Sequence, residues 1–183
     1  MSMVHIWLPI ALAGVANHVL STVFWMMLPF HKREWKKLPD EDEFMDLISF
    51  SNIPPGQYVF PLTYDSVEMR KPSFLAKQKR GTGMLVTWKK PPHMLLAIVS
   101  TLGFFLLASF VIGYLAMLAL EPGTPPKEVF RFVFTAGILA HCSAKFPYVL
   151  WFRRRILLEL FDGVAYAAAT AAIFAALWPD WAQ

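Results

Sequence analysis

The stretch AHCSAKFPYVLWFRRR, residues 140–155, decides the fold, because it joins one long apolar run to another through a cluster of arginines. Each run is long enough to cross a lipid bilayer, which takes about 20 apolar residues as a helix. Short loops rich in Lys and Arg mark the cytoplasmic side of a membrane. The stretch therefore predicts a hairpin of two membrane-spanning helices that turns at the inner face.

The rest of the chain continues this pattern of apolar runs. Hydrophobic residues make up 56% of the sequence and charged residues 16%, against about 25% charged in an average soluble domain. The third run is the weakest, because Arg131 and Lys145 interrupt it, but it gives an even number of spans. We predict an all-α membrane protein of one domain, residues 1–183, with four transmembrane helices over about 4–28, 94–120, 129–151 and 156–178.

The distribution of basic residues predicts the orientation. Eleven Lys and Arg lie in the loop of about 60 residues between the first two spans, residues 31–92, and three more, Arg153 to Arg155, lie between the last two. On the other side of the membrane we count only Lys127. By the positive-inside rule, the loop is cytoplasmic and both termini are periplasmic, in the inner membrane of a bacterial cell. Because the basic residues follow this topology, they do not indicate a nucleic-acid partner.

The inner loop, residues 31–92, has the pattern of a folded segment. Asp40 and Glu43 have the spacing of a capping box, which predicts an amphipathic helix over about 41–50, suited to the membrane surface. The alternating stretches QYVFPLTY (57–64) and GMLVTW (83–88) are consistent with a small antiparallel ribbon, in which Pro61 fits only an edge position. We expect this loop to fold against the membrane face or against a partner.

Two charged residues of the last hairpin fall at matching depth. Lys145 and Asp162 each lie about 12–14 Å from the arginine turn at a 1.5 Å rise per residue. A lone charge within the bilayer costs about 2.5–3.5 kcal/mol, so we predict that they form an ion pair. The functional alternative makes Asp162 a proton or cation site, with Lys145 or Arg153 as its counter-ion. For Glu159, an i, i+4 ion pair with Arg155 is expected.

Two histidines also share a level. His18 and His141 lie at similar depth on the first and third spans, and such a pair can hold a haem in a four-helix bundle. The alternative is a hydrogen bond between helices, from His18 or His141 to Tyr166. Cys142 is the single cysteine, so a disulfide within the chain and a CxxC metal or redox site are excluded, and no metal site is predicted. The sequence also lacks a phosphate-binding loop, a GxSxG elbow and an HExxH pair.

Four short motifs resemble a family of small four-span inner-membrane proteins of bacteria whose activity is uncharacterised. They are LPFHK (28–32), GQYVFP (56–61), FPYVLW (146–151) and Asp162 in the last span. Family members tend to have Trp where this chain has Phe30. The resemblance supports the four-span topology and implies no activity.

These patterns lead to three expectations for function. The first is a non-enzymatic accessory or structural subunit, which packs against a larger inner-membrane complex through the inner loop and requires no cofactor. The second is a small transporter or proton-coupled carrier that uses Asp162, Lys145 and His141. The third is a redox subunit that binds haem or a pigment. The sequence does not specify a cargo, a partner complex or an oligomeric state.

Overall fold

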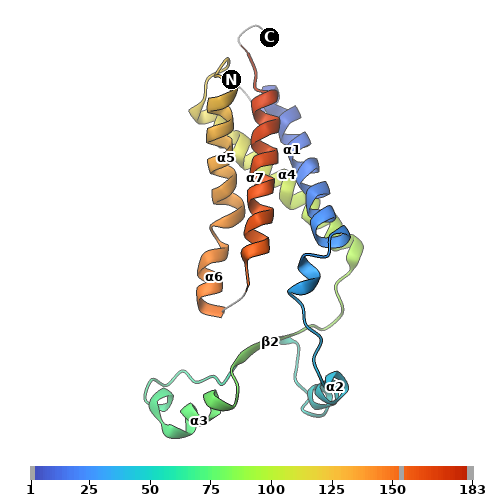
Figure 1. Cartoon of the computed structure of the whole chain (residues 1–183), viewed down its shortest axis with the longest axis vertical. Coiled ribbons are helices and arrows are strands. Elements are labelled where there is room, and N and C mark those ends of the chain that lie inside the picture. Colours follow the sequence, from blue (N-terminus) through green and yellow to red (C-terminus); the bar gives the residue numbers. More distant parts are fainter. Residues whose placement is uncertain (1–2, 153–154, 181–183) are drawn as a thin grey trace. The chain divides into compact units, whose positions relative to one another are not determined.

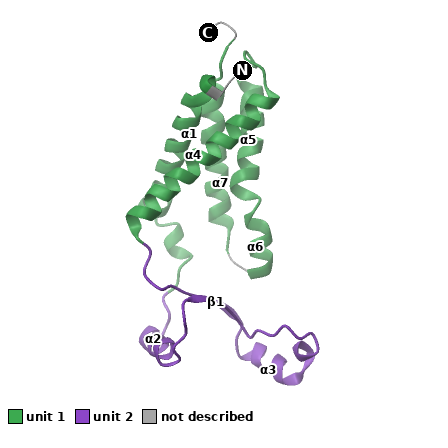
Figure 2. Cartoon of the chain, turned by 180° about the vertical axis from the view of Figure 1, so that it is seen from behind, with its two compact units in different colours: residues 1–36, 93–183 green, residues 37–92 purple. Residues whose placement is uncertain are grey.

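The computed structural model describes residues 3–152 and 155–180 and divides them into two compact units (Figure 2). We name residues 1–36 and 93–183 the helical unit, and residues 37–92 the loop unit. The single membrane domain over residues 1–183 stays a prediction.

The helical unit is built from four helices that are long and apolar enough to cross a membrane, as the sequence predicted. They cover Val4–Met27, Met94–Ala119, Pro126–Phe152 and Leu157–Ala176. The first contains a short 3-10 turn (Met3–Ile6), α1 (Trp7–Thr22) and a π-helical turn (Val23–Met27), the second is α4 (Met94–Ala119), and the fourth is α7 (Leu157–Ala176). The third divides into α5 (Pro126–Cys142) and α6 (Lys145–Phe152).

The break between α5 and α6 has a cause in the sequence. Pro147 lacks a backbone N–H, and its ring clashes with the carbonyl group four residues earlier, which belongs to Ser143. Ser143 and Ala144 form a turn, and Lys145 begins the next helix. The predicted continuous third span is therefore interrupted near its end.

The end of the first span is also shaped by a proline. The residue before a proline is restricted to extended conformations, and Leu28, which precedes Pro29, has a ψ of 144°. The helix widens into the π-helical turn just before this point and ends there. A 3-10 turn, His31–Arg33, follows and belongs to the same unit. His31 is thereby placed at the end of the bundle that carries Arg33 and Arg155, which we name the arginine end.

Four helices pack around a core near the opposite end, where the described chain begins and ends (Figure 1). In this arrangement α7 packs along both α5 and α1, and α4 packs along α1. Glycines allow the closest approaches, since a Cβ atom at Gly137 would meet the Cα atom of Ala167 at 2.9 Å. The buried hydrophobic cluster consists of Ala13, Ile112, Ala116, Val129, Val133, Ala171 and Phe174.

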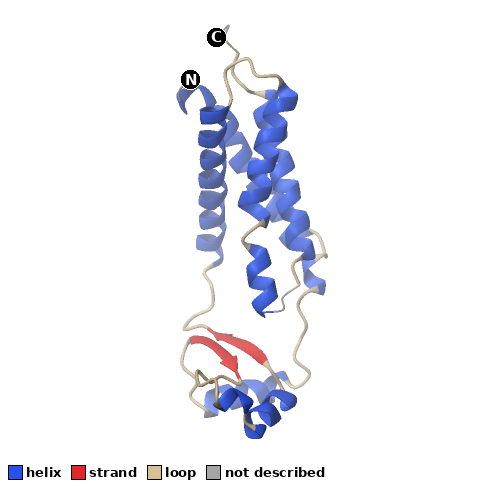
Figure 3. Cartoon of the chain, turned by 90° about the vertical axis from the view of Figure 1, so that its left-hand side faces the viewer, coloured by secondary structure: helices blue, strands red, loops and turns tan. Residues whose placement is uncertain are grey.

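The loop unit combines helices with a two-stranded sheet (Figure 3). It contains α2 (Glu41–Phe50), β1 (Gly56–Phe60), a 3-10 turn (Glu68–Arg70), α3 (Pro72–Arg80) and β2 (Gly83–Thr87). The strands are antiparallel and pair from Gly56 with Thr87 to Phe60 with Gly83, which confirms the predicted ribbon. The predicted helix over residues 41–50 is also confirmed, but its capping box is not formed, because Asp40 makes no side-chain capping hydrogen bond.

Candidate functional site

Polar side chains line the interface between α1 and α7. Three of them lie at four-residue intervals on each helix, a spacing that places residues on one face. They are Asn17, Ser21 and Trp25 on the first span, and Asp162, Tyr166 and Thr170 on α7.

These residues pair across the interface in antiparallel order. The indole N–H of Trp25 donates a hydrogen bond to the Asp162 carboxylate. The Tyr166 hydroxyl group bonds to Ser21, and Asn17 Nδ2 donates to Thr170 Oγ1 at 2.8 Å. We name these three pairs the polar ladder. The first and last pairs are eight positions apart, so the ladder extends about 12 Å along the helices.

At the arginine end the polar ladder joins a buried histidine. His31 Nε2 lies 3.0 Å from Asp162 Oδ2, and His31 Nδ1 lies 2.9 Å from Glu34 Oε2. The ring of Trp25 stacks on the ring of His31, with centroids 3.9 Å apart and planes 6° apart. His31 and Asp162 are both about 3% exposed. The 3-10 turn after the first span is therefore fixed to α7 by a buried polar contact.

The position of His31 between two carboxylates determines how protons are shared. A carboxylate is an acceptor only, and each imidazole nitrogen donates only when it carries a proton. Both contacts are hydrogen bonds when the ring carries two protons, or when one carboxyl group supplies the second proton. His31 can therefore bond to either carboxylate, and to both when its ring carries two protons, and this is the feature of the unit closest to acid–base chemistry.

Lys145 does not form the ion pair with Asp162 that their matching depth predicted. Its Nζ atom donates to the backbone oxygen of Glu159 at 3.0 Å and lies 3.5 Å from Glu159 Oε2. Asp162 is occupied by His31 and Trp25 instead. The two acidic residues lie three positions apart on α7 and contact different neighbours.

The expected pair between Glu159 and Arg155 is not formed within the described residues, where the cation beside Glu159 is Lys145. Arg153, which was considered as a counter-ion for Asp162, lies outside the described residues together with Arg154.

The two histidines considered for a haem, His18 and His141, lie on α1 and α5. α1 and α5 lie on one diagonal of the bundle, since α7 packs against both. On the other diagonal, the rings of Phe105 and Tyr166 meet with centroids 5.0 Å apart, and His141 contacts both rings. Two aromatic rings thus pack beside His141, and a haem between His18 and His141 stays a prediction.

The predicted hydrogen bond from a histidine to Tyr166 is also replaced. The ring of His141 meets the ring of Tyr166 edge to face at 73°, while the tyrosine hydroxyl group bonds to Ser21. Among the described residues, the buried atoms His18 Nδ1, His141 Nε2, Asn17 Oδ1 and Ser109 Oγ have no hydrogen-bond partner. No group of three or more His, Cys, Asp and Glu side chains is placed to hold a metal ion in the described part of the chain.

The polar ladder ends inside the bundle. One helical turn beyond Asn17 and Thr170, the facing residues are Ala13 and Phe174, both fully buried in the apolar core. Protons move through chains of hydrogen-bonding groups, and this core supplies none. The ladder therefore reaches from the arginine end only part of the way through the unit.

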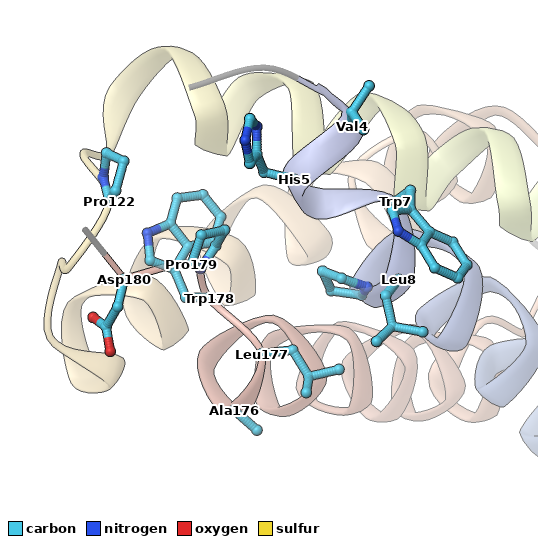
Figure 4. A pocket seen from close by; sticks show the side chains of 11 residues that line it. Val4, His5, Trp7, Leu8, Pro122, Ala176, Leu177, Trp178, Pro179 and Asp180 are labelled. Carbon is cyan, nitrogen blue, oxygen red and sulfur yellow. The ribbon is translucent and has the colours of Figure 1, made fainter. Parts of the chain in front are cut away.

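A separate cavity of about 760 Å³ opens at the opposite end, where the first and last described segments meet (Figure 4). Trp7, Trp178 and several prolines line it together with His5 and Asp180. Trp178 is held in place by a hydrogen bond from its Nε1 atom to the backbone oxygen of Glu121, at 3.0 Å. Its aromatic lining is typical of a membrane–water interface, and no nucleophile paired with a base is found among its lining residues.

The sequence alone did not identify His31 as a site residue. The available signals were its place directly after a proline-terminated span and the Glu three positions further on, at Glu34. Asp162 and Tyr166 were identified correctly as interior polar residues, but their partners were not.

Comparison with known proteins yields no match to a family model, to a curated protein or to a solved structure. The fold itself defines the class of protein: a mainly helical chain with four helices that are long and apolar enough to cross a membrane.

Proposed function

We propose that this chain is an integral inner-membrane protein with both termini outside, acting as a non-enzymatic accessory subunit of a larger membrane complex. Its four spans anchor it in the lipid bilayer, and its loop unit binds another membrane protein.

The exposed apolar side chains of the loop unit are the main support for this proposal. Of residues 37–92, all of which the structure describes, Phe74 is the only buried hydrophobic side chain. Large apolar side chains remain exposed instead, including Phe50 at 88%, Trp88 at 69% and Tyr64 at 93%. A small unit with so little buried apolar surface is marginal on its own. Exposed apolar side chains in such number are typical of a binding surface.

The charge of α2 favours a protein partner over the lipid surface. A groove of about 570 Å³ runs along this helix, with Phe44, Leu47 and Phe50 as its apolar lining and three acidic residues at its rim. Anionic lipids of the inner leaflet would repel this rim. A basic segment with apolar side chains on another membrane protein complements it in both charge and hydrophobicity.

Photo-crosslinking in native membranes tests this proposal. A photoreactive residue at Leu47 is expected to crosslink to a basic segment of another membrane protein, and the Phe50→Lys variant is expected to lose that crosslink. Leu75→Lys on α3 is the matched control, because it introduces the same charge at an exposed leucine of the same unit. Migration as a lone monomer on native gels, or crosslinks to lipid alone, would refute the subunit role.

The proposed orientation is tested separately by cysteine labelling. In a Cys142→Ala background, a cysteine at Thr124 should react with an impermeant maleimide added outside the cell, and a cysteine at Ser51 should not. The opposite pattern would reverse the topology.

A second candidate, a proton-coupled carrier, is supported by the buried contact between His31 and Asp162. The relevant set is then Asp162, His31 and Glu34 rather than Asp162, Lys145 and His141. The apolar core beyond Thr170 disfavours transport across this bundle alone, so we rank the carrier second. Unchanged proton flux in vesicles that carry Asp162→Asn would eliminate it.

We also propose membership of the family of small four-span inner-membrane proteins that the sequence motifs resemble. The contact between His31 of the LPFHK motif and Asp162 supports this proposal, because two widely separated motifs then serve one site. Relatives in which both residues change together would strengthen it.

A further inference from the structure

A cavity of about 570 Å³ lies at the arginine end of the helical unit. Its walls come from three places: the chain just after the first span, α6, and the start of α7. Most of the lining is apolar, and the polar members are Arg33, Glu34 and Arg155. The full lining is Phe30, Arg33, Glu34, Val149, Arg155, Ile156, Leu157 and Leu158.

The two arginines are the positive charges of this cavity. Neither Arg33 nor Arg155 takes part in an ion pair with the residues that the structure describes. The carboxylate of Glu34 lies 2.9 Å from His31 Nδ1, and as the one acidic lining residue it leaves an excess of positive charge in this cavity. A second cavity, of about 240 Å³, also borders Arg155 and Glu34 and adds the rings of Trp25 and Trp35 and the side chain of Glu159. The first cavity thus combines an apolar wall with two guanidinium groups, and tryptophans lie nearby.

We propose that this cavity binds an anionic phospholipid of the inner leaflet. The phosphate group lies between Arg33 and Arg155, and an acyl chain lies along the apolar wall formed by Val149 and Leu157. This inference rests on the proposed membrane location and orientation of the chain.

The chemistry of both parts of the site favours this ligand. Guanidinium groups bind phosphate through paired, charge-assisted hydrogen bonds. Basic pockets between helices on the cytoplasmic side are suited to anionic headgroups, and tryptophans gather at the same level. A free phosphate ion would use the arginines but not the apolar wall. A zwitterionic lipid would use the wall, but its headgroup carries no net charge for the arginines to attract.

Lipid binding to the full chain in detergent tests the proposal. The probes are phosphatidylglycerol, phosphatidylcholine and inorganic phosphate, and the readouts are the apparent dissociation constant by native mass spectrometry and the shift of the thermal unfolding midpoint. Two basic residues at a membrane surface predict a preference of about 30-fold for phosphatidylglycerol over phosphatidylcholine. The double variant Arg33→Gln/Arg155→Gln should reduce this preference to a few-fold at most.

A matched control separates the site from general charge. Lys89→Gln/Lys90→Gln removes the same two positive charges from exposed positions outside the helical unit and should keep the preference. To test the apolar wall, Leu157→Ser should weaken binding of both lipids.

Three results would overturn the proposal: equal binding of the two lipids, an unchanged preference in the arginine variant, or full stabilisation by inorganic phosphate alone. If the arginine variant does not fold, Arg33→Lys/Arg155→Lys keeps the charge and should retain most of the preference. Cysteine labelling distinguishes the two levels of failure. A chain with the expected topology but no lipid preference refutes only this inference, and a reversed topology refutes the membrane orientation on which it rests.

Discussion

The two ends of the interface between α1 and α7 are held together by different interactions. Towards the arginine end, hydrogen bonds join Asp162, Tyr166 and Thr170 to the first span. Towards the opposite end, Ala13 and Phe174 are buried among apolar side chains. α7 is continuous through both regions, while the first span passes from α1 into the π-helical turn at the level of Trp25.

This difference shows how the polar half can specify the position of one helix on another. Apolar contacts between membrane helices are not selective for a single register, because lipid tails are as apolar as the side chains. Hydrogen-bonded pairs at fixed levels are more selective, since a shift by one turn would leave the outermost polar groups of the ladder opposite apolar residues and unpaired. We interpret the polar ladder as the element that sets the register, and the apolar half as the element that fills the core.

The largest effect is expected from Asp162→Ala, which removes the acceptor shared by His31 and Trp25. Breaking a buried charged contact costs about 3–5 kcal/mol, because the remaining partner stays buried and unpaired. Thermal or denaturant unfolding in detergent should show that the free energy of unfolding falls by about 3 kcal/mol. Lys37→Ala is the control, since it removes one member of an exposed ion pair with Glu41 and should change stability by less than about 1 kcal/mol. Equal unfolding midpoints for both variants would contradict the structural role of Asp162.

The next largest effect is expected from Gly137→Ala, where α5 meets α7. The added methyl group would lie 2.9 Å from the Cα atom of Ala167, so the backbones must move apart. Overpacking of this kind costs about 1–3 kcal/mol. Gly103→Ala on α4 is the matched control, because nothing lies within 4 Å of its added Cβ atom. A destabilisation of the same size at both glycines would indicate a loss of helix flexibility rather than a steric clash.

The helices of this fold could be predicted from the sequence, because each depends on local pattern. Long apolar runs indicated the four spans, and the helix over residues 41–50 and the paired strands followed from their periodicity. The partners of the polar residues could not be obtained by counting depth, since depth does not specify which face of a helix a residue occupies.

The faces of α7 explain the error over Lys145. Gly163 and Ala167 approach α5, as their close contacts with Cys142 and Gly137 show. Glu159 lies four residues before Gly163 and so shares the face that looks to α5, where it meets Lys145. Asp162 lies on the neighbouring face, towards α1. The assignment of these faces needed the packing of three helices.

A smaller effect is expected for the middle of the polar interface, between Asn17 and Thr170. A double-mutant cycle with Asn17→Leu and Thr170→Val should give a coupling energy of about 0.6–1.7 kcal/mol, the range measured for hydrogen bonds between membrane helices. The control cycle combines Asn17→Leu with Thr135→Val, whose hydroxyl group bonds to the backbone of its own helix at Arg131. That cycle should give a coupling near zero. Similar values in both cycles would mean that the hydrogen bond does not fix the register.

The smallest effect is expected for Lys145, and it decides between the two pairings. A cycle of Lys145→Met with Glu159→Gln should give a coupling of about 0.5 kcal/mol, because the pair is partly exposed, with 31% and 16% of the side chains accessible. The cycle of Lys145→Met with Asp162→Asn should give a smaller coupling, because only a longer-range charge interaction joins these two residues, although Asp162→Asn alone is the more destabilising change. A larger coupling of Lys145 with Asp162 than with Glu159 would place the Lys145 amine beside Asp162. The helix α7 would then be rotated so that its polar face meets α5. In that arrangement His31 would lose its buried acceptor, so one pair of cycles tests the assignment of both faces of α7.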